Sequence, residues 1–365
     1  MPTVAFDVGP LHGHRTGVGV AVEQLLAAFG DTPSPMTIAP YVLSFRAELD
    51  DGVRRLTLPA AIAHRWWSHW SRPRVDRILG RPDLIHGTNY VVPPSRCPRL
   101  VSVYDCWFLR YPAGVHGDVA RAANVLRRSV ADGAVVHVSS EATAAQVRDL
   151  LDPQRVEVIP LGTVSVAPPR ADQPPPIPKL AGRRFVLSLG TLERRKNVPA
   201  LVRSFAAVHG AHPDVELVVA GSDGNDMVSI VEATNELSRS AAANVSFTGR
   251  LTESAKSWLL HNAAVLAYPS LDEGFGFPIL EAMQAGVPVV ASTAGSIPEV
   301  AGDAALLVGP TDVAALGAAI VTALGDHAER QRMIAAGRVR ATHFDWHTTA
   351  TRLTALYASM IEETP

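Results

Sequence analysis

The 365-residue sequence has little cysteine, no long apolar run and almost no net charge. Its two cysteines, Cys97 and Cys106, argue against a disulfide framework and against a zinc cluster. No run approaches the roughly 18 apolar residues of a membrane helix, and no basic stretch near the N-terminus resembles a signal peptide. A net charge of -2 lacks the basic footprint of a nucleic-acid-binding protein. These absences favour a cytoplasmic globular protein.

Short apolar runs recur along both halves of the chain, with helix-like stretches between them. Continuous rather than alternating apolarity indicates strands buried on both faces, as in parallel sheets covered by helices. The predicted strands are 3–8, 41–45, 83–87, 99–105, 134–139 and 155–160, then 185–190, 215–221, 245–249, 264–270 and 288–292. We therefore expect an α/β protein of two doubly wound, Rossmann-like domains.

A proline-rich segment separates the two halves. Residues 165–182 hold six prolines in eighteen residues, which excludes a helix or strand interior and predicts a linker. The expected domains are 1–168 and 180–344. In such an architecture a ligand is expected in the cleft between the domains, at the carboxyl ends of the strands.

The segment "SLDEGFGFPILEAMQAGVPVVAS" places two acids, Glu273 and Glu281, in apolar and glycine-rich surroundings. Pro278 suits a first helical turn and Gly286 a helix end, so a glycine-rich turn is expected to lead into a short helix. A turn of this kind brings a helix N-terminus close to an anion. The expected binding residues are Gly276, Phe277, Pro278 and Ile279, with Glu281 accepting from a ribose diol. Alternatively, Glu281 is a solvated helix residue and "GFGF" only a tight turn.

The same segment closely resembles the E-x7-E signature of retaining glycosyltransferases of family 4, which have the two-domain GT-B fold. Further stretches resemble this family in the same order: "DLIHGTNYVVPP", "LSLGTLERRKNVPALVRSF", "FTGRLTESAKSWLLHNAAVLAYPS" and "IPEVAGDAALLVGPTD". "DWHTTATRLTALYASM" is similar to the closing helix, which in the family crosses back onto the N-terminal domain. The resemblance thus implies a helix at about 345–365 that belongs with residues 1–168.

The resemblance also implies roles for individual residues. Glu273 matches the glutamate near the transferred sugar, Glu281 the one that binds ribose, and Lys196 the lysine that grips the diphosphate. Negative charge grows on the departing nucleoside diphosphate, so a fixed cation lowers the barrier. No metal ion is then required, and no cofactor is expected beyond the nucleotide-sugar co-substrate.

Further residues match the family less closely. Many relatives have an arginine directly after the glycine of "GTLERRKN", where this chain has Thr191. Arg195 is the candidate for that second cation, and the alternative is solvated surface charge. Arg250 matches a position near the base. Gly17 and Gly19, in "GPLHGHRTGVG", match the glycine loop that approaches the diphosphate.

The segment "VSVYDCW" departs from the family at a position near the sugar. Relatives commonly have histidine before the aspartate, whereas this chain has Tyr104 before Asp105. A phenol donates a hydrogen bond but is a poor cation at neutral pH. Either Tyr104 fills a catalytic role with Asp105 in a different way, or the protein is slow, altered or inactive. A core tyrosine at a strand end is the structural alternative.

Three tryptophans, Trp66, Trp67 and Trp70, lie among four arginines in "HRWWSHWSRPRVDR". Aromatic side chains mixed with arginine suit an anionic membrane surface that carries a lipid-linked acceptor. A helix that packs all three against the sheet explains the pattern equally directly, and helical spacing links Trp66 to Trp70. The packed interpretation is the one favoured by sequence.

The expected function is retaining transfer of a hexose from a nucleotide sugar, GDP-mannose first, to a hydroxyl of a glycan or glycolipid. UDP-sugars and dTDP-rhamnose stay open as donors. Two alternatives remain: a non-catalytic sugar-nucleotide or glycan-binding protein, which Tyr104 favours, and a two-domain enzyme such as a sugar-nucleotide epimerase. Transfer to an acceptor, rather than retention or isomerisation of the donor, separates the three.

Overall fold

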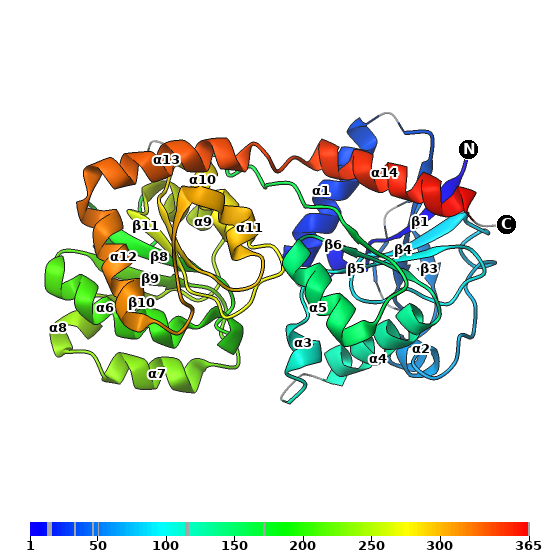
Figure 1. Cartoon of the computed structure of the whole chain (residues 1–365), viewed down its shortest axis with the longest axis horizontal. Coiled ribbons are helices and arrows are strands. Elements are labelled where there is room, and N and C mark those ends of the chain that lie inside the picture. The colour runs from blue at the N-terminus through cyan, green and yellow to red at the C-terminus, as the bar shows by residue number, and fades with distance from the viewer. Residues whose placement is uncertain are drawn as a thin grey trace. The chain divides into compact units, whose positions relative to one another are not determined.

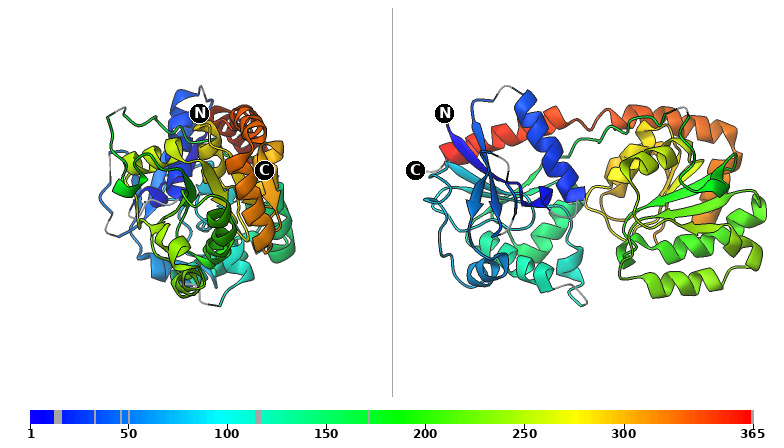
Figure 2. Two further views of the ribbon diagram at one scale, coloured as in Figure 1. Left: turned by 90° about the vertical axis from the view of Figure 1, so that its left-hand side faces the viewer. Right: turned by 180° about the vertical axis from the view of Figure 1, so that it is seen from behind.

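The computed structural model describes residues 1–12, 17–32, 34–45, 47–49, 51–113, 117–170 and 172–363. The chain divides into two compact units: Met1–Gly162 with Phe344–Pro365, and Thr163–His343. Each unit is built on one parallel sheet with helices on both faces (Figure 1). Both chain termini lie in the first unit (Figure 2).

The first unit has a seven-stranded sheet in the order β3-β2-β1-β4-β5-β6-β7, with every pair parallel. The strands are β1 (Thr3–Asp7), β2 (Thr37–Leu43), β3 (Arg54–Leu56), β4 (Leu84–Gly87), β5 (Arg99–Val103), β6 (Val135–Val138) and β7 (Val156–Val158). The helices are α1 (Gly17–Asp31), α2 (Ala60–Trp67), α3 (Trp107–Arg110), α4 (Gly117–Ala131), α5 (Glu141–Leu151) and α14 (Trp346–Glu362). The strand order reverses direction at β1, as in doubly wound sheets.

The second unit has a six-stranded parallel sheet in the order β10-β9-β8-β11-β12-β13. The strands are β8 (Phe185–Leu189), β9 (Glu216–Ala220), β10 (Val245–Phe247), β11 (Val265–Tyr268), β12 (Val289–Ser292) and β13 (Ala305–Val308). The helices are α6 (Val198–Ala211), α7 (Met227–Asn235), α8 (Arg239–Ala243), α9 (Glu253–Asn262), α10 (Phe277–Gln284), α11 (Ile297–Ala301), α12 (Val313–Gly325) and α13 (His327–Ala341). A 3-10 turn, η3 (Arg194–Lys196), precedes α6.

The predicted α/β class and parallel sheets are confirmed. Every residue of β8, β9, β11 and β12 is buried, as their continuous apolar sequences predict. Two strands were not predicted from sequence. β3 reads "RRL" and lies at a sheet edge, where one face meets solvent. β13, the other edge strand, reads "ALLV" and directly follows a short 3-10 turn, Gly302–Ala304.

The C-terminal helix α14 packs against α1 and the first sheet, so the expected return to the N-terminal unit is confirmed (Figures 1 and 2). Its buried face includes Leu353, Leu356 and Tyr357. Thr349 Oγ1 donates to the carbonyl of Pro160, 2.8 Å away, at the other end of the contact.

A buried chain of hydrogen bonds ties α14 to three strands. His137 Nε2 lies 3.0 Å from the carbonyl of Ile159, which only accepts, so Nε2 carries the proton. Burial lowers the pKa of His137 to about 4, so the ring is neutral and Nδ1 accepts from Ser102 Oγ at 2.8 Å. The Ser102 oxygen then accepts from His86 Nε2 at 2.8 Å.

His86 completes this chain. Burial, and then the nearby His137, hold the pKa of His86 well below its usual value, so its ring is neutral too. With Nε2 donating, its Nδ1 accepts from the Tyr357 hydroxyl at 2.7 Å. Each histidine nitrogen and each hydroxyl in this series of hydrogen bonds thus has a partner. Buried polar groups of this kind are costly only when they lack one. His86 is therefore a structural residue of the contact between α14 and the sheet.

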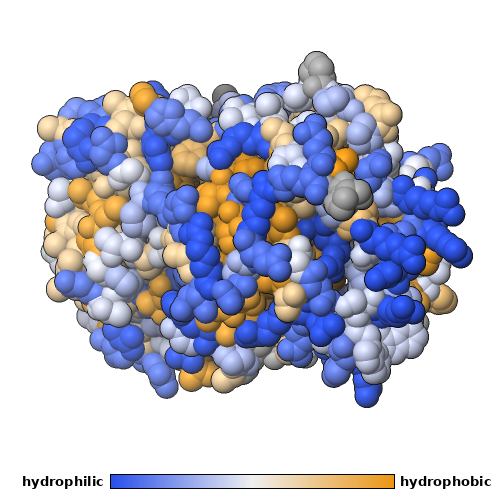
Figure 3. All heavy atoms as spheres, turned by 45° about the vertical axis from the view of Figure 1, so that its right-hand side comes forward, coloured by the Kyte–Doolittle hydropathy of each residue, from blue (hydrophilic) through white to orange (hydrophobic). Residues whose placement is uncertain are grey.

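The prediction that all three tryptophans pack into the core is wrong. Trp67 is buried and its Nε1 donates to the carbonyl of Pro73, but Trp66 and Trp70 are 41% and 62% exposed. The reason is that the buried face of α2 carries Ala63 and Trp67, whereas Trp66 lies off that face. Trp70, whose N–H donates to the Trp66 carbonyl at 2.8 Å, lies four residues further along on the side of Trp66. Hydrophobic side chains also reach the surface elsewhere: the face in Figure 3 shows them between hydrophilic ones.

Candidate functional site

The cationic part of the site lies at the carboxyl end of β8. The chain leaves the strand through Gly190, whose φ of +144° is accessible to glycine, and forms η3 before α6 begins. Asn197 follows η3 in the left-handed conformation, with φ of +53°. Its side-chain amide donates to the carbonyls of Pro269 and Pro310, 3.1 and 2.7 Å away. The turn is thereby fixed to the loops that follow β11 and β13.

Glu273 lies in the loop between β11 and α10 and is only 6% exposed. Its Oε1 accepts from Lys196 Nζ at 2.6 Å, and its Oε2 accepts from Arg195 Nη1 at 2.6 Å. Lys196 Nζ also donates to the Tyr268 hydroxyl at 2.7 Å. Each carboxylate oxygen of Glu273 therefore already has a charged donor.

Gly295 supports this loop from behind. Its φ is +55°, and a Cβ there would lie 2.5 Å from the carbonyl oxygen of Glu273. A side chain is thus excluded on both conformational and steric grounds. The Glu273 carbonyl in turn accepts from Ser296 N at 2.9 Å.

The electrostatics of the cluster are those of a buried charge balanced by two cations. Burial alone would raise the pKa of Glu273, but Arg195 and then Lys196 outweigh it and lower that pKa to about 2. Burial lowers the pKa of Lys196, and the negative charge of Glu273 offsets part of this shift. Burial and the same carboxylate raise the pKa of Tyr268 well above its usual value, so its phenol is neutral. A second carboxylate, Glu193, lies further away, with its Oε2 3.8 Å from Arg195 Nη2.

Glu281 lies five residues into α10 and is 3% exposed. Its Oε1 accepts from Lys256 Nζ of α9 at 2.6 Å. The Lys256 side chain is 29% exposed and is held on a helix that Thr252 caps by accepting from Ala255 N. The alternative in which Glu281 is a solvated residue is therefore wrong, because the carboxylate is buried and paired.

The turn before α10 has the predicted form. Gly276 is the N-cap, with φ of +95°, and α10 begins at Phe277 with Pro278 in its first turn. Ile279 is fully buried, and its N–H donates to the carbonyl of Gly276 at 3.0 Å. Its amide is thus used within the turn, which leaves it a packing role. Phe277 stacks edge-on against Phe275, 5.2 Å between ring centroids.

The outer cations differ from the inner ones. The Arg195 side chain is only 16% exposed and is bound within the cluster, so the solvated alternative is wrong for it. Its neighbour Arg194 is exposed. Thr191 and Arg250 are exposed as well, and among the described residues no hydrogen bond or ion pair joins Arg250 to Glu281 or to the cationic cluster.

The candidate residues of the first unit do not form a comparable cluster. Tyr104 is 7% exposed, its hydroxyl is sealed from solvent, and within the described ranges it has no hydrogen-bond partner. Burial raises its pKa, so it stays a neutral phenol. Asp105 accepts from Trp107 N at 3.1 Å and from the Tyr90 hydroxyl at 3.4 Å, which makes it a local turn residue.

The two glycines of the N-terminal loop, Gly17 and Gly19, lie in the first turn of α1. Gly19 is buried within the helix packing. Residues 13–16 of the predicted glycine loop lie outside the described residues.

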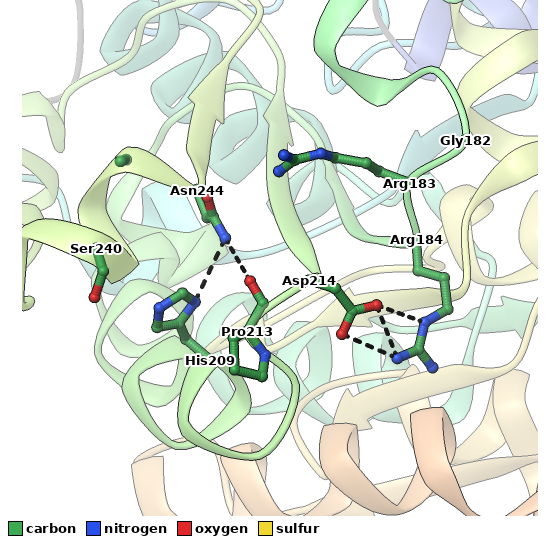
Figure 4. A pocket seen from close by; sticks show the side chains of 9 residues that line it. Gly182, Arg183, Arg184, His209, Pro213, Asp214, Ser240 and Asn244 are labelled. Atoms are coloured by element: carbon green, nitrogen blue, oxygen red, sulfur yellow. Dashed lines mark hydrogen bonds and ion pairs between the residues drawn. The ribbon is translucent and has the colours of Figure 1, made fainter.

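A polar hollow lies at the amino-terminal ends of the strands of the second sheet, opposite the site described above. Its charged side chains are already paired with one another. It lies where β8, β9 and β10 begin, and Figure 4 shows Arg184 paired with Asp214 and Asn244 bound to the Pro213 carbonyl. Arg183 donates to Glu216 at 2.6 Å. Since each cation here has its carboxylate, and since ligands of such sheets bind at the carboxyl ends of strands, we assign no function to this hollow.

Tyr268, Asn197 and Lys256 were not predicted as site residues. Asn197 had a signal, because an asparagine after a short basic turn suits the left-handed conformation. Tyr268 reads as the end of an apolar strand, and Lys256 reads as an ordinary surface lysine of a helix. Their contacts depend on long-range packing, which a local pattern does not contain.

The side chains of the described residues include no group of three or more His, Cys, Asp or Glu placed to hold a metal ion. The same part of the chain contains no helix that is both long and apolar enough to cross a membrane.

Comparison with known proteins finds a family match in the second unit. Residues 170–340 match the family model "Glycosyl transferases group 1", which is less than half of the chain. The chain is 33% identical to "O-antigen chain mannosyltransferase B" of Escherichia coli over 180 residues, which are 49% of this chain and 47% of the relative. The match to this mannosyltransferase thus spans about half the length of each protein.

Solved structures confirm the GT-B fold. Sucrose-phosphate synthase from Thermosynechococcus elongatus superposes with a TM-score of 0.75 at 20% identity, covering 99% of this chain and 100% of the other. Anabaena HepE in complex with UDP and glucose superposes with a TM-score of 0.73 at 17% identity, covering 98% and 100%. At such identities the likeness defines the fold alone.

Proposed function

We propose that this protein is a group 1 glycosyltransferase that moves a hexosyl group from a nucleoside diphosphate sugar to a hydroxyl of a glycan or glycolipid, with retention at the anomeric carbon and without a metal ion. The observation that carries the proposal is the cluster of Arg195, Lys196 and Glu273 at the carboxyl end of the second sheet. A mannosyl donor, GDP-mannose, is the first candidate because the chain is similar to a mannosyltransferase. The HepE complex supports a nucleoside diphosphate as the leaving group.

The chemistry follows from the charges. When the bond between the sugar C1 and the β-phosphate oxygen breaks, its electron pair goes to the phosphate, and the leaving group gains negative charge. Lys196 and Arg195, held in place by Glu273, stabilise that charge; a charged hydrogen bond is worth about 1.5–3 kcal/mol. The acceptor hydroxyl forms the new bond to C1 on the same face and passes its proton to the departing phosphate oxygen.

Glu273 is poorly suited to be a covalent nucleophile. Both of its oxygens accept from cations, and its pKa of about 2 indicates a strongly stabilised carboxylate. A nucleophile would have to give up those bonds in order to attack. A same-face displacement without a glycosyl-enzyme intermediate is therefore the mechanism we propose.

The test is the anomer of the product. With GDP-α-mannose and a panel of glycan and glycolipid acceptors, NMR is expected to find an α-mannoside and GDP, at a rate unchanged by EDTA. A β-mannoside would contradict retention, and loss of activity in EDTA would contradict metal independence. If GDP-α-mannose is not used, the same measurement with UDP-α-glucose tests whether the protein is a retaining glycosyltransferase with a donor of another base.

A non-catalytic sugar-nucleotide-binding protein is the second candidate, and Tyr104 is the observation that favours it. A neutral phenol sealed from solvent supplies neither the charge nor the accessible donor of a histidine at that position. Such a protein binds the nucleotide sugar and leaves it intact in the presence of every acceptor. The transfer assay above distinguishes the two functions.

We also propose that Trp66 and Trp70 contact an anionic membrane that carries the acceptor. They line a hollow on the first unit with the exposed arginines Arg72, Arg74 and Arg96. Exposed indole rings and guanidinium groups suit the headgroup region of anionic lipids. Trp67 has no part in this contact because it is buried.

Sedimentation with vesicles tests the membrane contact. The wild type is expected to sediment with phosphatidylglycerol vesicles, and Trp66→Ser with Trp70→Ser to reduce the bound fraction several-fold. Phe45→Ser is the matched control, since Phe45 is a 65% exposed aromatic of the same unit outside the hollow. Equal binding to neutral phosphatidylcholine vesicles, or no binding at all, would remove the proposal.

A further inference from the structure

The hollow on the first unit, called the arginine hollow below, is lined by cations without an acceptor. Within the part of the chain that the structure describes, the exposed guanidinium groups of Arg72, Arg74 and Arg96 make no hydrogen bond or ion pair. By contrast, Arg155 of the same unit pairs with Glu157 at 2.7 Å. The lining residues of the arginine hollow are Trp66, Trp70, Arg72, Pro73, Arg74 and Arg96.

Internal hydrogen bonds join the two segments that carry these arginines. Val75 is buried, and its N–H donates to the carbonyl of Pro94 at 3.1 Å. The Asp76 carboxylate accepts from Arg96 N at 2.8 Å and from Ser95 Oγ at 2.6 Å. The backbone on both sides of the arginine hollow is therefore fixed before any ligand binds, which lowers the entropy cost of binding.

Two carboxylates near the arginine hollow are already engaged. Asp132 accepts from Ser71 Oγ and, at 3.2 Å, from Arg128 Nε. Burial would raise the pKa of Asp76, but the hydrogen bonds named above and then the charge of Arg74 outweigh it and lower that pKa, so Asp76 is ionised. Among the described residues, neither carboxylate forms an ion pair with a lining arginine. Three positive charges thus face the one negative charge of Asp76, which suits an anion with more than one charge.

The arginine hollow lies away from the edge of the first sheet where a reacting ligand is expected. β5 begins at Arg99, so Arg96 lies at the amino-terminal end of that strand. Ligands of doubly wound sheets bind at the carboxyl ends of the strands. A ligand of the arginine hollow is therefore held at a separate place and takes no part in the chemical step.

A phosphomonoester matches three guanidinium groups better than a phosphodiester does. It carries nearly two negative charges at pH 7 and presents three strong acceptor oxygens, whereas a diester carries one charge. A planar guanidinium group binds phosphate oxygens through two parallel N–H bonds. Beside the arginines lie Trp66 and Trp70, and exposed indole rings are typical of the headgroup level of a bilayer. The combination suits a lipid rather than a soluble phosphate ester.

We propose that the arginine hollow binds the phosphomonoester headgroup of a membrane lipid, with the three guanidinium groups on the phosphate oxygens and the two exposed indole rings in the headgroup region. The inference deepens the membrane contact proposed above and rests on it. It narrows that contact from any anionic surface to one headgroup chemistry.

The experiment compares two anionic lipids at matched surface charge. The full chain is sedimented with phosphatidylcholine vesicles that contain either phosphatidic acid, a phosphomonoester, or phosphatidylglycerol, a diester. Because the monoester carries nearly twice the charge, phosphatidic acid is used at about half the mole fraction. The wild type is expected to bind the phosphatidic acid vesicles about 5-fold or more tightly than the phosphatidylglycerol vesicles.

The variant that tests the guanidinium groups keeps their charge. Arg74→Lys with Arg96→Lys retains both cations but removes the planar forks, so the preference is expected to fall below about 2-fold while binding to phosphatidylglycerol stays nearly unchanged. Both side chains are exposed, so the fold is expected to tolerate the change. Arg148→Lys is the matched control, because Arg148 is an exposed arginine of α5 in the same unit and does not line the arginine hollow. It is expected to leave the preference unchanged.

The outcomes separate the headgroup from the membrane contact. Equal binding to the two lipids, or a preference that Arg74→Lys with Arg96→Lys leaves intact, overturns the inference and leaves the membrane contact standing. If no vesicle is bound, the membrane contact fails and the inference falls with it. Calorimetry with glycerol 3-phosphate tests the remaining source of the same chemistry: a soluble phosphomonoester that binds as tightly as the vesicles would overturn the assignment to a lipid.

Discussion

Glu273 and Glu281 are separated by seven residues and are both buried, at 6% and 3% exposure, yet their carboxylates have different partners. Both oxygens of Glu273 accept from cations, Lys196 and Arg195. Among the residues that the structure describes, one cation, Lys256, donates to Glu281, and it contacts a single oxygen. The first carboxylate is saturated within the protein, and the second keeps an acceptor for a ligand.

This difference indicates different roles for the two glutamates. A saturated carboxylate positions the groups that bind it, so Glu273 acts by holding Arg195 and Lys196 in place. A half-saturated carboxylate at a buried position is maintained for something that arrives from outside. We therefore propose that Glu273 positions the cations and that Glu281 contacts the ligand.

Glu273→Gln is expected to have the largest effect and to act on stability. The amide cannot balance the two cations, and removal of one partner of a buried ion pair costs about 3 kcal/mol. The folded pKa of about 2 lies below the ordinary value of 4.5, so this stability is fully present above pH 4.5 and is lost as the pH falls to about 2. Urea unfolding at pH 7, 4 and 3 is expected to show the variant and the wild type converging. A constant difference across this range would contradict the pairing.

Lys196→Ala is expected to have the next largest effect, on nucleotide affinity. Loss of a charged hydrogen bond to the diphosphate corresponds to about 10- to 150-fold weaker binding. Arg194→Ala is the matched control, because Arg194 is exposed in the same turn and is expected to change affinity less than about 2-fold. Calorimetry with GDP or UDP measures both. Equal losses in the two variants would indicate a diffuse surface charge rather than a fixed cation.

Glu281→Gln is expected to have the smallest of the three effects. The amide retains one acceptor for the ribose but loses the charge, so ribonucleotide affinity is expected to fall about 10-fold. Binding of inorganic pyrophosphate, which has no ribose, is expected to stay unchanged. A loss that is the same for pyrophosphate and for the nucleotide would place Glu281 at the phosphates and erase the contrast with Glu273.

Much of the fold could be predicted from the sequence because it depends on local composition. The buried parallel strands read as continuous apolar runs, and the glycine turn before α10 reads as a strand-to-helix connection. Edge strands such as β3 were missed because their sequences carry no such run. The prediction was wrong for Trp66 and Trp70 because helical spacing shows that two residues share a face but not whether that face is buried.

The residues of the candidate site could be predicted from the sequence better than the contacts between them. Glu273, Lys196 and Arg195 could be named from a motif, but the fact that they bind one another depends on a loop closing over η3. The Lys256 pair and the buried chain from Tyr357 to His137 join distant parts of the sequence. Such contacts are created by packing, and no spacing along the chain encodes them.

The most direct test is a crystal structure of the protein with the nucleoside diphosphate that binds most tightly. We predict that the diphosphate lies within hydrogen-bond distance of Lys196, with Glu273 still bound to its two cations, and that the ribose hydroxyls contact Glu281. A nucleotide bound elsewhere, or a ribose that contacts Glu273 while Glu281 stays vacant, would contradict the account.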